Sequence, residues 1–64
     1  MAQQMLRIDG EDFIAEQVTA ENLSTAKAIN ANAKVGDWCV TSQDQTMEFV
    51  SSEEYELTLR SKEV

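Results

Sequence analysis

The sequence contains no histidine, no proline and a single cysteine, Cys39. Histidine is the side chain that most often serves as a general base near neutral pH, so its absence excludes serine and cysteine triads that depend on imidazole within one chain. One cysteine forms no internal disulfide, and without histidine it supplies too few ligands for a zinc site. We therefore expect no catalytic residues, no metal site and no cofactor.

Long apolar runs are also missing. No segment approaches the roughly 18 consecutive apolar residues of a membrane-spanning helix. The first residues, MAQQMLRIDGED, do not show the basic and then apolar pattern of a signal peptide. The sequence therefore predicts a cytoplasmic protein that makes no contact with a membrane.

A chain of 64 residues is long enough for one domain and for no more. Hydrophobic residues make up 42% of it and charged residues 27%, which is the composition of a folded protein rather than of a disordered segment. We expect a single small domain over 1–64, with residues 1–4 frayed. A core of this size leaves a net stability of about 3 to 5 kcal/mol.

Acidic residues outnumber basic ones, with 12 Asp and Glu against 5 Lys and Arg, and the net charge is −7. This charge opposes direct binding to nucleic acid, because the main attraction in such complexes is between phosphates and cationic side chains. A protein partner is expected to present a basic surface instead. Between Lys34 and Arg60 no base interrupts the acids, which are Asp37, Asp44, Glu48, Glu53, Glu54 and Glu56.

A first pair of strands is indicated near the amino terminus. Residues 5–8 and 13–18 are rich in apolar side chains and flank Asp9-Gly10. Asp-Gly is a favoured two-residue hairpin turn because both positions tolerate positive φ. The sequence therefore predicts a β-hairpin in this region.

A second hairpin is predicted further along the chain. Residues 35–41 alternate with period two, so that Trp38 and Val40 share one side of the strand. The polar stretch 42–46 is suited to a loop, and 47–50 returns as the partner strand.

Two helices complete the expected fold. Thr19 is placed to cap a helix over about 20–33, although the asparagines in this stretch weaken it. In a capping box, the Ser51 hydroxyl would accept a hydrogen bond from the Glu54 N–H, and the Glu54 carboxylate would accept one from the Ser51 N–H. This spacing predicts a short C-terminal helix over about 52–60. Two hairpins and two helices give an α+β domain with a small antiparallel sheet.

The second half of the chain also shows a family likeness. KVGDWCV at 34–40 is followed by a polar turn, by MEFV at 47–50 and by SEEY at 52–55. This order resembles a small, largely uncharacterised module of bacteriophage and prophage proteins, in which a Pro-Gly-Asp-aromatic strand, a turn, a Glu-aromatic strand and a terminal helix follow one another. Val35 stands at the position of the proline. The resemblance implies a phage origin, and hence the cytoplasm of a bacterial host, but no activity.

Trp38 has two interpretations. Its place in the alternating strand favours a core residue, whereas tryptophan also ranks among the residues that dominate binding energy at protein interfaces. The other candidates for contact with a partner are acids of the second hairpin and the helix after it. The predicted protein-binding residues are therefore Trp38, Asp44, Glu48, Glu53, Glu54 and Glu56.

These features favour a non-enzymatic acidic module that binds and modulates or inhibits a bacterial host protein. Two alternatives stay open. The acids could imitate DNA phosphates and occupy the basic groove of a DNA-binding enzyme, or the chain could be a minor structural or assembly protein that forms homo-oligomers. Glu53 and Glu56 would share one helical face, and paired carboxylates can do acid and base work as in glycosidases. So small a chain, however, offers no cleft deep enough to hold a sugar.

Overall fold

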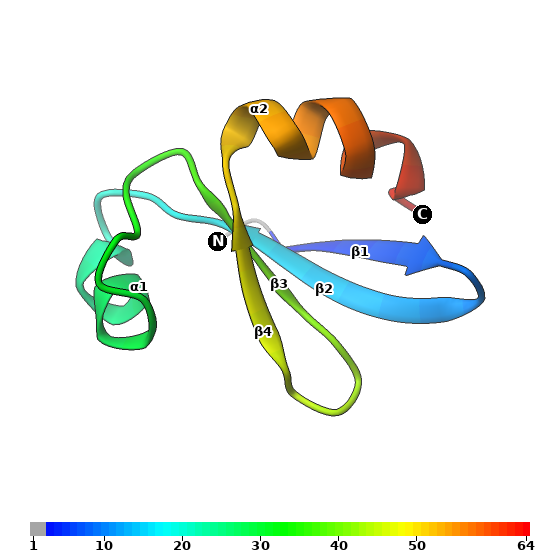
Figure 1. Ribbon diagram of the computed structural model, residues 1–64, viewed down its shortest axis with the longest axis horizontal. Coiled ribbons are helices and arrows are strands. Elements are labelled where there is room, and N and C mark those ends of the chain that lie inside the picture. The colour runs from blue at the N-terminus through cyan, green and yellow to red at the C-terminus, as the bar shows by residue number, and fades with distance from the viewer. Residues whose placement is uncertain (1–2) are drawn as a thin grey trace.

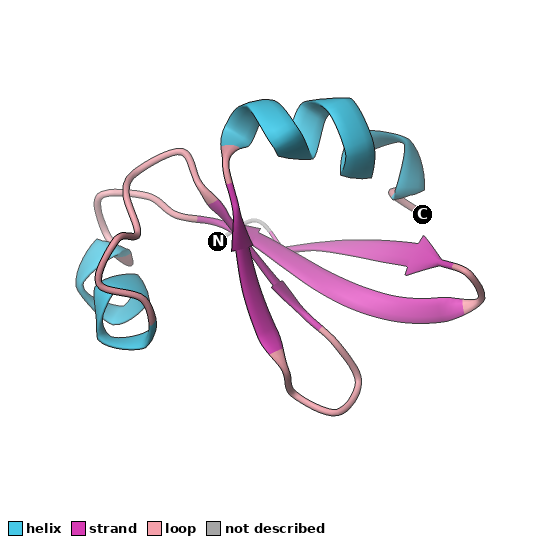
Figure 2. Cartoon of the chain, in the orientation of Figure 1, coloured by secondary structure: helices cyan, strands magenta, loops and turns pink. Residues whose placement is uncertain are grey.

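The computed structural model describes residues 3–64 and shows one four-stranded antiparallel sheet accompanied by helices (Figure 2). The strands lie in the sheet in chain order and are β1 (Gln3–Ile8), β2 (Glu11–Gln17), β3 (Trp38–Thr41) and β4 (Met47–Val50). Helix α1 (Leu23–Ile29) connects β2 to β3. Three short helical turns follow β4, namely α2 (Ser52–Glu54), η1 (Tyr55–Leu59) and η2 (Arg60–Lys62). This is the α+β class that the sequence predicts.

The first hairpin has the predicted turn. Ile8 at the end of β1 pairs with Glu11 at the start of β2, and the two residues between them are Asp9 and Gly10. Their φ angles are 52° and 81°, in the left-handed region that Asp and Gly enter at low cost. The right-handed twist of the two strands is compatible with a turn of this kind.

The expected fraying of residues 1–4 is wrong for Gln3 and Gln4. Both belong to β1 and pair with residues of β2. The end of the chain supports the same strand from its other edge, where the Val64 N–H donates to the Met5 carbonyl oxygen at 3.0 Å. The first two residues of the chain lie outside the described part.

Helix α1 is shorter than the helix predicted over 20–33, and Thr19 does not cap it. The residue at the cap position is Asn22, whose side chain accepts a hydrogen bond from the Thr19 N–H at 2.7 Å and donates to the last carbonyl of β2 at 3.2 Å. Beyond the helix, the Asn30 side chain accepts from the backbone N–H two residues on at 2.9 Å. Asparagine side chains thus hold the flanking backbone in turns that compete with helix.

Strand β3 begins at Trp38 and not at Val35 as predicted. The backbone before it turns, because the Asp37 carboxylate accepts a hydrogen bond from the Lys34 N–H at 3.2 Å. Gly36 inside this turn has a φ angle of 99°, which is the left-handed region that other residues avoid. The extended conformation can therefore start only after the turn has closed.

The C-terminal helical segment, formed by α2, η1 and η2, extends to Lys62 and so passes the predicted end of the helix over 52–60. The Ser51 hydroxyl accepts a hydrogen bond from the Glu54 N–H at 3.1 Å, which is the first of the two bonds in the predicted capping box. In η1 the Arg60 N–H bonds to the carbonyl five residues back, so this turn is wider than an α-helical one.

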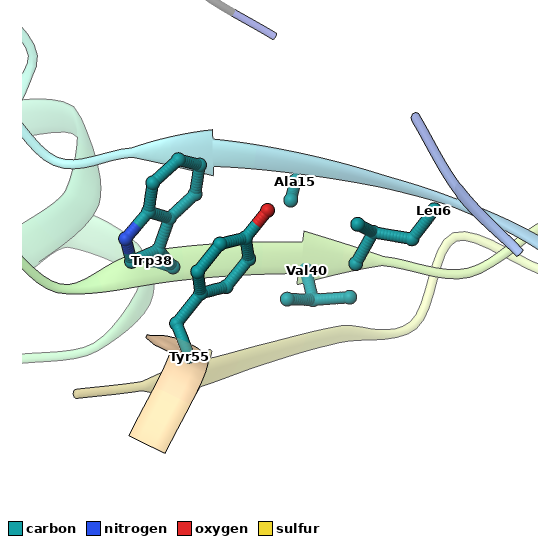
Figure 3. Packing of buried hydrophobic residues seen from close by; sticks show 5 residues of the cluster. All are labelled: Leu6, Ala15, Trp38, Val40 and Tyr55. Atoms are coloured by element: carbon teal, nitrogen blue, oxygen red, sulfur yellow. The ribbon is translucent and has the colours of Figure 1, made fainter. Parts of the chain in front are cut away.

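The core lies between the sheet and the C-terminal helical segment (Figure 3). It consists of Leu6, Ala15, Trp38, Val40 and Tyr55. The Trp38 and Tyr55 rings stack with centroids 3.9 Å apart and an interplanar angle of 6°. An offset aromatic pair adds about 0.5 to 1.5 kcal/mol to the stability gained by burial. This contact fixes the helical segment over the sheet.

Helix α1 packs less deeply and lies beyond one end of the sheet (Figure 1). Its only buried residue is Ala26, which joins Val18 and Ala33 in a second, small cluster. Ile29, the last residue of this helix, is 51% exposed. The helix therefore leaves most of one sheet face uncovered.

Candidate functional site

Two of the predicted binding acids are engaged within the chain itself. The Asp44 carboxylate accepts hydrogen bonds from the Ser42 hydroxyl and from the Thr46 N–H in the loop between β3 and β4, and these bonds hold the pKa of Asp44 below its usual value. The Glu56 carboxylate pairs with Arg60 one helical turn later, and this hydrogen-bonded pair likewise lowers the pKa of Glu56. Both acids stabilise local structure.

Two other predicted acids come together. Glu48 and Glu54 line a groove of about 310 Å³ between the sheet and the C-terminal helical segment. Its remaining walls are largely apolar and include Phe13, Val50 and Leu59. Glu53 is exposed at the start of that segment. The six predicted residues therefore do not form one surface.

Trp38 is a core residue, with 7% of its surface exposed. Its ring lies against Tyr55, whose hydroxyl donates to Glu63 at 2.7 Å, and the Arg60 guanidinium lies 5.8 Å from the centroid of the Trp38 ring. Burial is the main cause that raises the pKa of Tyr55 well above its usual range, and the hydrogen bond to Glu63 is the second. Of the two interpretations of Trp38, the structure supports the core.

The sheet has two unlike faces. The C-terminal helical segment lies along one of them, which we call the covered face (Figure 1). Successive residues of a strand point to opposite sides, so the residues that alternate with the core residues share the other face, which we call the open face. The open face carries Gln3, Met5, Arg7, Asp12, Ile14, Glu16, Cys39, Thr41, Met47 and Phe49.

A row of four paired residues crosses the open face, and we call it the apolar row because three of the four are apolar. Met5 pairs with Ile14, Ile14 with Thr41, and Thr41 with Met47, so one residue from each strand contributes. Met5 is 43% exposed, Ile14 37% and Met47 46%. An antiparallel sheet with one face in water normally carries polar residues there. A contiguous exposed apolar surface instead marks a site of interaction.

A second row beside the first contains one charged residue. Its members, in strand order, are Gln3, Glu16, Cys39 and Phe49. The Gln3 amide donates to Oε1 of Glu16 at 3.5 Å, a long and weak hydrogen bond. Oε2 of Glu16 is shielded from solvent and has no hydrogen-bond partner among residues 3–64. This carboxylate lacks the contacts that a partly buried charge requires.

Helix α1 forms a wall at one end of the open face. Together they form a groove of about 280 Å³. It is lined by the second row, by the apolar row except Met5, and by Thr25 and Ile29 of the helix. Cys39 lies on its floor, and burial raises the pKa of this thiol above its usual value. A protonated thiol is a poor nucleophile, so the Cys39 side chain is weakly reactive near neutral pH.

The remaining charges on the open face compensate each other. Arg7 and Asp12 occupy paired positions on β1 and β2, and their side chains form an ion pair at 2.8 Å. This pair lies beside the apolar row, on the side away from Glu16. Glu16 is therefore the one acid of the open face, within the described chain, that no cation accompanies.

Sequence reasoning missed the open face. The acids attracted attention because they are numerous, whereas the exposed apolar residues are spread over four strands that are far apart in the chain. The available signal was in β2, where Ile14 and Glu16 share one face and Phe13 and Ala15 the other, so that neither face is uniformly polar. An apolar residue on each face of a strand indicates that both faces make contacts.

Comparison of the chain with protein-family models, with curated proteins and with solved structures gives no match. Among residues 3–64, no three side chains of the metal-binding types come together. None of the helices in that range has the length and apolar character needed to cross a membrane.

Proposed function

We propose that this protein is a non-enzymatic acidic interaction module that binds a bacterial host protein and modulates or inhibits it. The observation that carries the proposal is the open face, where Met5, Ile14 and Met47 form an exposed row across a sheet whose other face is covered. The phage origin and the bacterial host rest on the resemblance of residues 34–55 to a phage module.

The charge of the molecule supports a basic partner. A net charge of −7 on a chain of 64 residues attracts a positively charged surface over distances of about a Debye length, roughly 8 Å at physiological salt. Apolar contact on the open face then supplies the short-range affinity. The absence of histidine and the protonated state of Cys39 support a function without catalysis.

Affinity capture from a bacterial lysate, with the intact protein as bait, tests this proposal. The informative variant is Met47→Glu, which places a charge in the apolar row. Leu57→Glu is the matched control, because Leu57 is 78% exposed on the C-terminal helical segment and gains the same charge. We expect the wild-type protein and the control to retain the same bacterial protein, and Met47→Glu to retain it about tenfold less.

Circular dichroism of both variants separates loss of binding from loss of fold. Equal capture by the two variants would show that the open face is not the binding surface. A lysate from which the wild-type bait retains no specific protein would contradict the proposed function itself.

Phosphate mimicry is the second candidate, and the groove shared by Glu48 and Glu54 favours it. A mimic loses its partner steeply as salt rises, and DNA competes for the same surface of the partner. If the partner binds through apolar contacts on the open face, the amount captured should change little with salt, and added DNA should not displace the partner. Repeating the capture at raised salt and with added duplex DNA therefore distinguishes the two candidates.

A further inference from the structure

We infer that the open face binds an amphipathic helix of the partner protein, with one lysine or arginine of that helix inserted beside Glu16. This inference deepens the function proposed above and rests on it. It names the occupant of the open face and the contact that selects it.

The shape of the open face is suited to a helix. Small α+β domains are layered, and a sheet that is apolar on both faces is completed by helices on both. Here the C-terminal helical segment supplies one helical layer, while α1 stands at the end of the sheet and walls the groove of about 280 Å³ (Figure 1). A helix laid across the apolar row would contact Met5, Ile14 and Met47 together.

Glu16 determines the chemistry of that helix. Among residues 3–64, its Oε2 atom is withdrawn from water without a hydrogen-bond partner, and its other oxygen has only the 3.5 Å contact to Gln3. A carboxylate in this position gains from a cationic donor that arrives with the partner, because one of its oxygens is already removed from water in the free protein.

A second copy of this chain is a poor occupant. Two molecules with a net charge of −7 each repel one another, and face-to-face pairing brings the two unpaired Glu16 carboxylates into one apolar interface. Arg7 is the one cation that residues 3–64 place on the open face, and it is already paired with Asp12. The charges therefore favour a basic partner over self-association.

Two synthetic helical peptides of equal composition and equal positive charge test the inference. Both carry an apolar stripe of leucines, and they differ in one lysine, which lies within the stripe in the first peptide and on the polar side in the second. Titration by fluorescence anisotropy gives both affinities for the wild-type protein. We expect the first peptide to bind about tenfold more tightly, because its lysine alone reaches Glu16 from the apolar side.

Glu16→Gln removes the charge at nearly constant shape and should abolish this preference. Glu53→Gln is the control, since it removes one exposed charge from the C-terminal helical segment and should leave the preference unchanged. Amide chemical shifts of the labelled wild-type protein locate the peptide without any variant. They should move at Ile14, Glu16 and Phe49 and stay constant in the groove lined by Glu48.

The inference would be overturned by equal affinity for the two peptides, by a preference that survives Glu16→Gln, or by shift changes confined to the groove lined by Glu48. A failure of both peptides to bind, while capture from lysate still depends on Met47, would overturn the helical occupant and leave the proposed function standing. Light scattering that shows a dimer dispersed by Met47→Glu would assign the open face to a second copy and overturn it as well.

Discussion

Tyr55 contributes to the fold through its ring and through its hydroxyl. The ring stacks on Trp38, and the hydroxyl donates to the Glu63 carboxylate, which also accepts from Arg60 at 2.8 Å. One side chain therefore links the core of the sheet to the last turn of the chain. The position of η2 over the sheet depends on this link.

The two contributions of Tyr55 separate by substitution. Tyr55→Phe keeps the stacked ring and removes one hydrogen bond, so the free energy of unfolding should fall by about 1 kcal/mol. Tyr55→Ala removes the ring and should cost about 3 to 5 kcal/mol, which is the whole stability expected for so small a core. Urea denaturation followed by Trp38 fluorescence measures both. Equal losses in the two variants would contradict the role of the ring.

Substitution of Glu16 should have the opposite effect on stability and raise the free energy of unfolding. Its carboxylate is partly withdrawn from water without a full set of partners, so Glu16→Gln should raise the free energy of unfolding by about 0.5 to 1 kcal/mol. Glu21→Gln, at an exposed position before α1, should change it by less than about 0.5 kcal/mol. Thermal unfolding followed by circular dichroism checks both variants. A clear loss of stability in Glu16→Gln would mean that the carboxylate is satisfied in the free protein.

Among the elements, the C-terminal helical segment depends on its first turn. The Ser51 hydroxyl satisfies the Glu54 N–H, and loss of such a cap costs about 1 kcal/mol. Ser51→Ala should therefore lower the melting temperature by about 4 to 8 °C in a domain of this size. Ser52→Ala removes a hydroxyl one residue later and is the matched control, with an expected change below about half of that. Similar shifts in the two variants would contradict the capping role.

The elements that the sequence predicts well are those with local causes. Asp9-Gly10 closes a hairpin because both residues accept positive φ, and Ser51 begins a helix because its own hydroxyl reaches the third residue on. The extent of α1 has no such cause. The side chains of Asn22 and Asn30 form hydrogen bonds with the flanking backbone, in place of the backbone bonds of a longer helix. One acceptor of the Asn22 side chain is the last carbonyl of β2, so the start of α1 depends on where β2 ends.

The candidate site could be predicted only in part. Net charge, a property of composition alone, predicts a basic partner, and this stays a prediction. The open face is assembled from one residue per strand, so it exists only once the order β1-β2-β3-β4 and the register are known. The withdrawn state of Glu16 depends on neighbours from two other strands, which the chain does not place near it in sequence.

At the scale of the whole molecule, alkaline pH should unfold the protein through Tyr55. Burial and the Glu63 carboxylate raise the pKa of Tyr55 in the native state well above the value of about 10 that an exposed tyrosine has. Below pH 10 both the native and the unfolded states keep the phenolic proton, and the stabilising contribution is complete. Above that pH the unfolded state releases the proton while the native state retains it. Stability therefore falls as pH rises, by up to about 1.4 kcal/mol per pH unit.

Tyr55→Phe isolates this effect from the titration of lysines and arginines, because all other groups are the same in the two proteins. The wild-type protein should be the more stable one at pH 7, and its advantage should shrink steadily from pH 10 to pH 11 as the unfolded state ionises. Urea midpoints measured for both proteins at pH 7, 9, 10 and 11 give the difference directly. A difference that stays constant over this range would show that Tyr55 ionises equally in both states, which is incompatible with a phenol stacked on Trp38 and bonded to Glu63.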